Sequence, residues 1–172
     1  MVSCSERVRM AVAEHTRKIL TLREKETALV RVDLEHLEDL HLRAMTVDNG
    51  KHEFDIDEPQ ERGGTDLAPA PLPFFLAGAS SCFLMQCVKL AIVNQLALND
   101  VKMSAIGRFD RRRGGGFEEI IYELRITGSE PREKVVEMVR EAEKMCYASN
   151  TLKHSVKMRV RLWYNNEQLP LG

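Results

Sequence analysis

Four thiols are the side chains of this chain best suited to covalent chemistry: Cys4, Cys82, Cys87 and Cys146. A thiolate can attack an electrophile or bind a metal, and its surroundings decide which. The cysteines form no C-x-x-C pair and the five histidines fall at no zinc-ligand spacing. Neither a metal nor another cofactor is therefore expected, and the chemistry to consider is that of single reactive thiols.

Cys82 has the surroundings that suit a reactive thiol. It follows the small residues Ala77 to Ser81, which let another backbone approach the sulfur and leave a cleft beside it. Cys87 lies five positions later, about 140° around a helix, so the two thiols cannot serve one site. Cys87 is interpreted as a buried core thiol, and Cys82 is the candidate for chemistry.

Cys82 lies within Pro71 to Asn99, a stretch that is apolar on nearly every side of a predicted helix of about seven turns. A helix of this kind must be buried. Polar residues, including Gln86 and Lys89, interrupt it and argue against a membrane span. The stretch is therefore predicted to be the long central helix of a soluble domain.

Before this helix the pattern predicts one helix and three strands. Ser5 to Lys25 has an amphipathic helical period, with His15 expected to pack on its apolar stripe. The period changes to two over 28–35, 40–44 and 51–56, and Asp48-Asn49-Gly50 is typical of a turn. An antiparallel three-stranded meander is expected.

After the central helix the chain is predicted to form a hairpin, a helix and a last strand. Two strands, one beginning at Val101 and one ending at Ile126, alternate apolar and polar residues on either side of a Gly-rich turn. Ser129 is then expected to cap a helix that reaches Met145 or Cys146. This helix buries Val135, Val136, Met138, Val139 and Ala142, and residues 154–164 alternate as a closing strand. The predicted order of elements is α-βββ-α-ββ-α-β.

Two loops have residues that could bind an anion, but both are interpreted as solvated surface. Arg62 precedes Gly63-Gly64 without the Gly-Lys-Ser/Thr of a phosphate loop. The basic hairpin tip, 108–113, has no interleaved aromatic residues.

With a net charge of −1, no nucleic acid or membrane partner is expected. The first residues do not resemble a signal peptide, so a reducing cytoplasm is expected.

Two segments carry a family resemblance. GGTDLAPAPLPFFLAGASSCF and the later KMCYASNTL resemble the signature regions of the OsmC/Ohr family, the osmotically inducible protein C and organic hydroperoxide resistance proteins. The resemblance covers about Ala28 to Tyr164. It divides the chain into an N-terminal helix appendage, 1–27, and an OsmC-like domain, 28–172.

The resemblance implies an α+β homodimer whose subunits intertwine and bury their central helices together. It also implies a thiol-dependent peroxidase that reduces organic hydroperoxides. Cys82 would attack the peroxide and become a sulfenic acid, Cys146 would capture it as a disulfide, and a dithiol, often lipoyl-linked in such proteins, would reduce that disulfide. Cys4 and Cys87 would take no part.

The chain departs from the family pattern at the start of the central helix. Family members usually carry a Glu there that orients an activating Arg, whereas this chain has Leu72 and Pro73. Arg31 and Arg43 are the candidates for that arginine by region.

A substitute acid could come from the preceding loop, where Glu61 and Asp66 are nearest in sequence. The missing acid also leaves an alternative open: a non-catalytic dimer of this fold that binds a small apolar ligand or senses oxidant.

Overall fold

The computed structural model describes residues 5–22, 24, 26–47, 50–112 and 115–154, and the backbone of 162–164 and 167–169. In chain order the elements are α1 (Glu6–Thr21), β1 (Val32–Glu38), β2 (His41–Thr46), β3 (Glu53–Ile56), the short 3₁₀ helix η1 (Gln60–Arg62), α2 (Pro71–Val93), β4 (Leu98–Phe109), β5 (Phe117–Gly128), α3 (Arg132–Met145), α4 (Tyr147–Lys153), β6 (Leu162–Tyr164) and β7 (Glu167–Leu169). The α+β class is confirmed.

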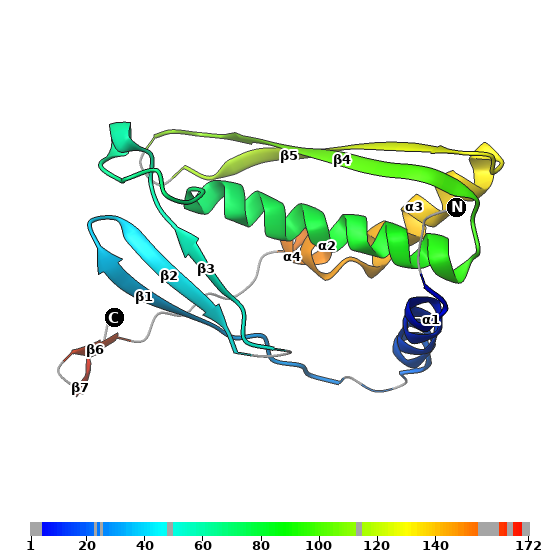
Figure 1. Cartoon of the computed structure of the whole chain (residues 1–172), viewed down its shortest axis with the longest axis horizontal. Coiled ribbons are helices and arrows are strands. Elements are labelled where there is room, and N and C mark those ends of the chain that lie inside the picture. Colours follow the sequence, from blue (N-terminus) through cyan, green and yellow to red (C-terminus); the bar gives the residue numbers. More distant parts are fainter. Residues whose placement is uncertain are drawn as a thin grey trace.

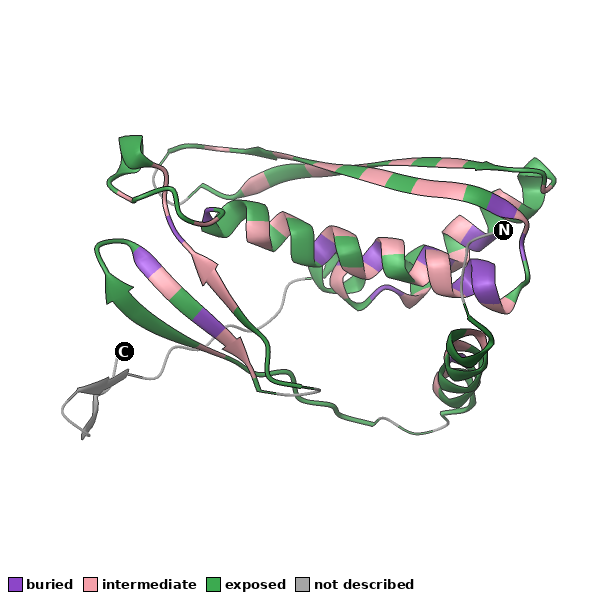
Figure 2. Ribbon diagram, viewed as in Figure 1, coloured by how far each residue is buried: buried purple, intermediate pink, exposed green. Residues whose placement is uncertain are grey.

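Helix α2 lies between the long β4–β5 hairpin and the pair α3 and α4 (Figure 1). The meander β1–β3 extends away from the N-terminal end of α2, and α1 lies near its C-terminal end. Buried side chains gather where α2, α3 and the start of β4 meet, whereas β1 and α1 are mostly exposed (Figure 2). The buried core consists of Phe83, Cys87, Leu90, Ala91, Leu96, Leu98, Met138, Ala142 and Cys146.

The central helix ends earlier than its apolar pattern predicts. Pro71 occupies the first turn, where its missing N–H is no loss, but the helix stops at Val93 rather than Asn99. Gln95 adopts a left-handed φ of 53°, and the chain then turns back into β4. Leu96 and Leu98 are buried after this turn, so their apolarity reflects the core and not a continuing helix.

The burial predicted for α2 is incomplete within one chain. Phe83, Cys87 and Leu90 are buried, but Met85 is 54% exposed on another face. Within the described residues, α2 is also the one helix that is long and apolar enough, by length and composition, to cross a bilayer. Its remaining face therefore has no cover in a single copy of the chain.

The meander and the hairpin form with the predicted alternation. In the meander β2 pairs antiparallel with both β1 and β3, and the register places Arg43 opposite Asp55. In the hairpin the partly buried face includes Met103 and Tyr122. Part of the predicted turn at Asp48-Asn49-Gly50 and part of the Gly-rich hairpin tip lie outside the described residues.

Helix α1 packs through a stripe that agrees only in part with the predicted one. It ends at Thr21 rather than near Lys25, and the Ser5 hydroxyl accepts a hydrogen bond from the amide of Val8. Val12 and Ile19 are half-buried as expected, but Thr16 is buried and His15 is exposed. The contact of α1 with α2 decides which residues of this amphipathic helix are covered.

Helix α3 begins without the predicted hydroxyl cap. Its N-cap is Pro131, and Ser129 does not cap it. The Glu130 carboxylate instead accepts a hydrogen bond from the Ala97 amide at 2.9 Å, which ties the helix start to the turn between α2 and β4. Val136, predicted to be buried, is 47% exposed.

The chain after α3 contains one helix that the pattern does not predict. The break at Cys146 separates α3 from α4, a helix of seven residues. Most of the predicted closing strand, 154–164, lies outside the described residues, and the backbone of β6 pairs antiparallel with β7.

A buried carboxylate shapes the loop that leads into α2. Asp57 is 1% exposed and accepts hydrogen bonds from the amides of Glu58, Thr65 and Leu67 at 2.8, 3.1 and 3.2 Å. The Thr65 hydroxyl donates to it as well, and this bond is the main reason that the pKa of Asp57 falls to about 2. Four donors thus organise the chain between β3 and α2 around one ionised side chain.

We expect Asp57→Asn to lower the thermal unfolding midpoint at pH 7 by about 5 °C or more, because an amide nitrogen cannot accept the hydrogen bonds that it replaces. A depressed pKa stabilises the fold above the unfolded pKa of 3.8, and that stability is lost as the pH falls towards about 2. The difference in thermal unfolding midpoint between wild type and variant, measured by circular dichroism, should therefore become smaller from pH 4 to pH 2. Asp66→Asn, an exposed change in the same loop, is the control, and a gap independent of pH would contradict the prediction.

Candidate active site

Two of the four cysteines meet in the fold. The Cys146 thiol donates a hydrogen bond to the Cys82 sulfur, with the two Sγ atoms 3.6 Å apart. Cys82 is partly exposed in the middle of α2, and Cys146 is fully buried. The predicted proximity of these two thiols, 64 residues apart, is confirmed.

The break between α3 and α4 positions Cys146. This residue ends α3 with an extended backbone and is also the N-cap of α4, where its Sγ accepts a hydrogen bond from the Ser149 amide at 3.4 Å. The Asn150 side chain closes the break by donating to the Lys144 carbonyl at 2.8 Å. Ser149 and Asn150, three and four positions after Cys146, therefore hold the chain in a turn that directs the sulfur at α2.

Within one chain the surroundings of Cys82 favour the neutral thiol. Burial raises the pKa of Cys82, the nearby Cys146 thiol raises it further, and the amides of Ala148 and Tyr147 oppose both effects. Neither Arg31 nor Arg43 is among these influences. Strong activation of Cys82 would need a positive charge beyond these contacts.

Cys87 belongs to the core and not to this site. It is fully buried, and burial raises the pKa of its thiol to about 11. This placement agrees with its interpretation as a core thiol. Cys4 lies outside the described residues.

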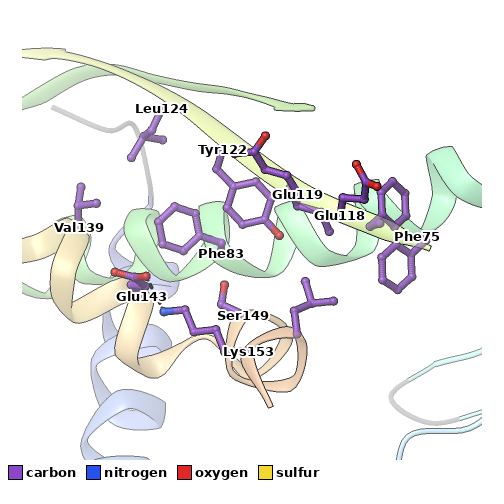
Figure 3. A pocket seen from close by; sticks show the side chains of 13 residues that line it. Phe75, Phe83, Glu118, Glu119, Tyr122, Leu124, Val139, Glu143, Ser149 and Lys153 are labelled. Atoms are coloured by element: carbon purple, nitrogen blue, oxygen red, sulfur yellow. Dashed lines mark hydrogen bonds and ion pairs between the residues drawn. The ribbon is translucent and has the colours of Figure 1, made fainter. Parts of the chain in front are cut away.

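A cavity of about 680 Å³ lies next to residues that adjoin the two thiols, and neither cysteine is among its described lining residues. Phe83, which follows Cys82, and Ser149, whose amide holds Cys146, both line it. Its walls come from α2, β5, α3 and α4, as Figure 3 shows. The apolar part of the lining consists of Phe75, Phe83, Phe117, Ile120, Leu124, Val139 and Leu152, and it suits the apolar part of a small molecule. Charged side chains also line the cavity: Glu118, Glu119, Glu143 and Lys153.

Tyr122 is a site residue that the sequence pattern does not single out. It lies on the inward face of β5, as its alternation predicts, and its ring stacks on Phe83 with the centroids 5.5 Å apart. Its hydroxyl is buried without a hydrogen-bond partner among the described residues. Alternation predicts which way such a side chain faces, but only the fold shows what surrounds the hydroxyl.

The two arginines that were candidates by region both pair with aspartates. Arg43 donates to both carboxylate oxygens of Asp55, at 3.0 and 3.4 Å, and Arg31 pairs with Asp33 at 2.8 Å. The bond to Asp55 is the main cause of a raised pKa for Arg43. The two-point contact with Asp55 holds the Arg43 guanidinium in a defined plane.

Within one chain the acid bound to Arg43 is Asp55, on the neighbouring strand. Glu61 is exposed in η1 and Asp66 is exposed after it. Strand pairing brings Asp55 to Arg43 from a position that sequence distance from the helix does not indicate, and the role expected of Glu61 or Asp66 stays a prediction.

Most of the described basic and amide groups in the two loops considered as anion sites are already paired. Arg62 pairs with Glu58 at 3.0 Å, and the amides of Gly63 and Gly64 donate to backbone carbonyls of the same loop. At the hairpin tip Arg108 pairs with Glu119 and Arg112 with Asp110. Both loops are solvated surface, as interpreted.

Taken together, the fold and site define a class of α+β protein in which two neighbouring thiols from separate helices lie beside an apolar cavity. Residues 63–161 match the family described as OsmC-like protein. This match spans more than half of the chain, and the chain belongs to the OsmC-like family.

Solved structures share the fold. An OsmC-like protein from Mycoplasma pneumoniae is 20% identical, with 76% of this chain and 89% of that chain covered and a TM-score of 0.60. An organic hydroperoxide resistance protein from Elizabethkingia anophelis is 21% identical, covering 76% and 91% with a TM-score of 0.60. An organic hydroperoxide resistance protein OsmC from Legionella pneumophila is 24% identical, covering 75% and 92% with a TM-score of 0.58. No curated protein matches the chain.

Proposed function

We propose that this protein is a thiol-dependent peroxidase that reduces organic hydroperoxides. The observation that carries the proposal is the 3.6 Å separation of the Cys82 and Cys146 sulfurs beside an apolar cavity of about 680 Å³. Family membership supports it, as do neighbours of the same fold that are named organic hydroperoxide resistance proteins.

The reaction follows from the chemistry of two close thiols. The Cys82 thiolate attacks the terminal oxygen of R–O–O–H, the O–O bond breaks, and the products are a Cys82 sulfenic acid and an alkoxide, which takes up a proton and leaves as an alcohol. The Cys146 thiol then attacks the sulfenic sulfur, which forms a disulfide and releases water. A dithiol reductant, for which a lipoyl group is our candidate, restores both thiols and becomes a cyclic disulfide itself.

The different burial of the two cysteines supports this assignment of roles. The attacking sulfur must meet a substrate, and Cys82 is the partly exposed member of the pair. The resolving sulfur needs to reach only Cys82, and Cys146 is completely buried against it. A second thiol this close would also protect the sulfenic acid from further oxidation.

The proposal is tested by incubating the protein with cumene hydroperoxide and a dihydrolipoyl reductant. We expect consumption of the hydroperoxide, and, without reductant, a disulfide-linked Cys82–Cys146 peptide detected by mass spectrometry. Protein that consumes no hydroperoxide with either a monothiol or a lipoyl dithiol would overturn the function. An oxidised Cys82 that advances to the sulfinic acid without a disulfide would remove the resolving role of Cys146.

The raised pKa of Cys82 and the absent acid at Leu72 and Pro73 favour a second candidate function. In this alternative the fold binds a small apolar ligand or senses oxidant without turnover. The rate at which iodoacetamide alkylates Cys82 at pH 7 separates the two, because an activated thiolate reacts fast and a desolvated thiol slowly.

We also propose that the protein is a homodimer whose two α2 helices pack together. Gly78, Ser81 and Met85 are spaced three and four apart, share one face of α2 and are exposed in a single chain. The two small residues leave room for a second helix to approach closely. In the meander, Leu34 is 60% exposed on a strand that a partner could cover.

We expect light scattering at micromolar concentration to give a mass of about twice 19.6 kDa. Met85→Glu should shift the protein towards the monomer, because it would bury an unpaired charge in the interface. Met10→Glu is the control, since Met10 is 67% exposed on α1. A wild-type mass of one chain would contradict the dimer.

We propose in addition that Arg43 of the second subunit supplies the positive charge that Cys82 lacks within its own chain. Asp55 would replace the missing helix acid by holding the guanidinium at two points. A fixed cation near the sulfur would lower the thiol pKa and so counter the effect of burial.

A further inference from the structure

Tyr122 has a hydroxyl that the fold of one chain leaves without a role. The ring is held in place by its stacking on Phe83, the residue next to Cys82. The hydroxyl oxygen is buried and finds no hydrogen-bond partner among the described residues. Buried polar groups are nearly always paired, so an unpaired one beside a cavity calls for an explanation.

The position of the hydroxyl suggests what it would bind. Tyr122 lines the cavity, and in Figure 3 its hydroxyl is directed to the side of the cavity where Ser149 lies. Phe83, on which the ring stacks, adjoins Cys82, and the Ser149 amide on the facing wall donates to the Cys146 sulfur. The hydroxyl is therefore on the side of the cavity nearest the two thiols. Burial is the main cause that raises the pKa of Tyr122, so the hydroxyl remains protonated at neutral pH, as a donor.

We infer that Tyr122 is a catalytic residue that donates a proton to the leaving oxygen of the hydroperoxide. This inference rests on the proposed peroxidase function. As the Cys82 thiolate bonds to the terminal oxygen of R–O–O–H, the O–O bond breaks and its electron pair goes to the RO oxygen. The Tyr122 hydroxyl gives its proton to that oxygen, so an alcohol leaves, and the phenolate takes a proton from water.

The chemistry of the leaving group explains why a donor is useful here. An alkoxide is a much stronger base than a phenolate, so the proton transfer is downhill once the O–O bond breaks. Two other donors line the cavity, the Ser149 hydroxyl and the Lys153 ammonium, and Lys153 is already paired with Glu143. Of these donors, Tyr122 is the one whose ring stacks on the neighbour of Cys82. A carboxylate leaving group, as in a peracid, is a weak base and needs no such donor.

The test compares wild type with Tyr122→Phe, which removes the hydroxyl and keeps the ring that stacks on Phe83. Loss of the Cys82 thiol is followed in single-turnover experiments with cumene hydroperoxide, peracetic acid and iodoacetamide. We expect the variant to react at least about 30-fold more slowly with cumene hydroperoxide, and within about threefold of wild type with the other two reagents. Normal rates with those two would also show that the variant is folded and that Cys82 is intact.

Two results would overturn the inference alone. One is an unchanged rate with cumene hydroperoxide. The other is an equal slowing with all three reagents, which would mean that Tyr122 acts on the thiolate and not on the leaving oxygen. Wild-type protein that does not react with cumene hydroperoxide would overturn both the inference and the proposed function.

Discussion

Replacing Cys82 by serine is expected to abolish hydroperoxide turnover, with kcat/KM reduced by at least about 10⁴-fold. Serine keeps the size of the side chain, but its hydroxyl is not ionised near neutral pH and cannot attack the peroxide. Turnover is measured as the consumption of cumene hydroperoxide with a dihydrolipoyl reductant. Cys87→Ala, a change of the core thiol on the same helix, is the matched control and should keep most of the activity per folded molecule.

Cys146→Ser should behave differently from Cys82→Ser. Because Cys82 would remain reactive, the variant should undergo one fast oxidation and then stall with Cys82 as a sulfenic or sulfinic acid. Intact mass measured before and after peroxide would show one or two added oxygen atoms. Continued turnover with the dithiol would contradict a resolving role, and equal loss of the first oxidation in both variants would contradict the separate roles.

Arg43→Met is expected to slow the oxidation of Cys82 by about 100-fold, because it would remove the charge that favours the thiolate. Without that cation the pKa of Cys82 should rise, so the pH at which alkylation by iodoacetamide reaches half its maximal rate should move upward. Asp55→Asn should have a smaller effect in the same direction, since it loosens the guanidinium without removing it.

Three variants serve as controls for this prediction. Arg31→Met removes an arginine of the same meander, and Glu61→Gln and Asp66→Asn remove the two loop acids that do not contact Arg43 in the fold. All three should keep wild-type rates and an unchanged alkylation profile. A slow Glu61 or Asp66 variant would restore the loop acid as the partner of the activating arginine, and a normal Arg43 variant would remove Arg43 from the site.

Local sequence patterns determined most of the secondary structure. The two-residue alternation through Val32 and Leu34 and through Met103 and Tyr122 depends only on near neighbours, so the meander and the hairpin follow from it. The small residues before Cys82 likewise identified the reactive candidate, because they are a property of one short segment. Family signatures around both cysteines were equally visible without coordinates.

Helix ends and faces were less predictable. The apolar run continues to Leu98 although the helix stops at Val93, because core residues after a turn are as apolar as those within a helix. On α1, apolar spacing indicated His15 as the packed residue, but the contact with α2 buries Thr16 instead. Periodicity shows that an element has a covered side, and the neighbouring element decides which residues that side includes.

The sequence by itself therefore determined the α+β class, the order of elements up to α3 and the choice of Cys82 as the thiol to examine. Only the tertiary structure decided that Cys146 lies 3.6 Å from it, that Asp55 holds Arg43, and that the Tyr122 hydroxyl, beside a cavity, has no partner among the described residues. Each of these facts joins residues that are far apart in the chain or on different elements. Their distances depend on packing, which local spacing does not encode.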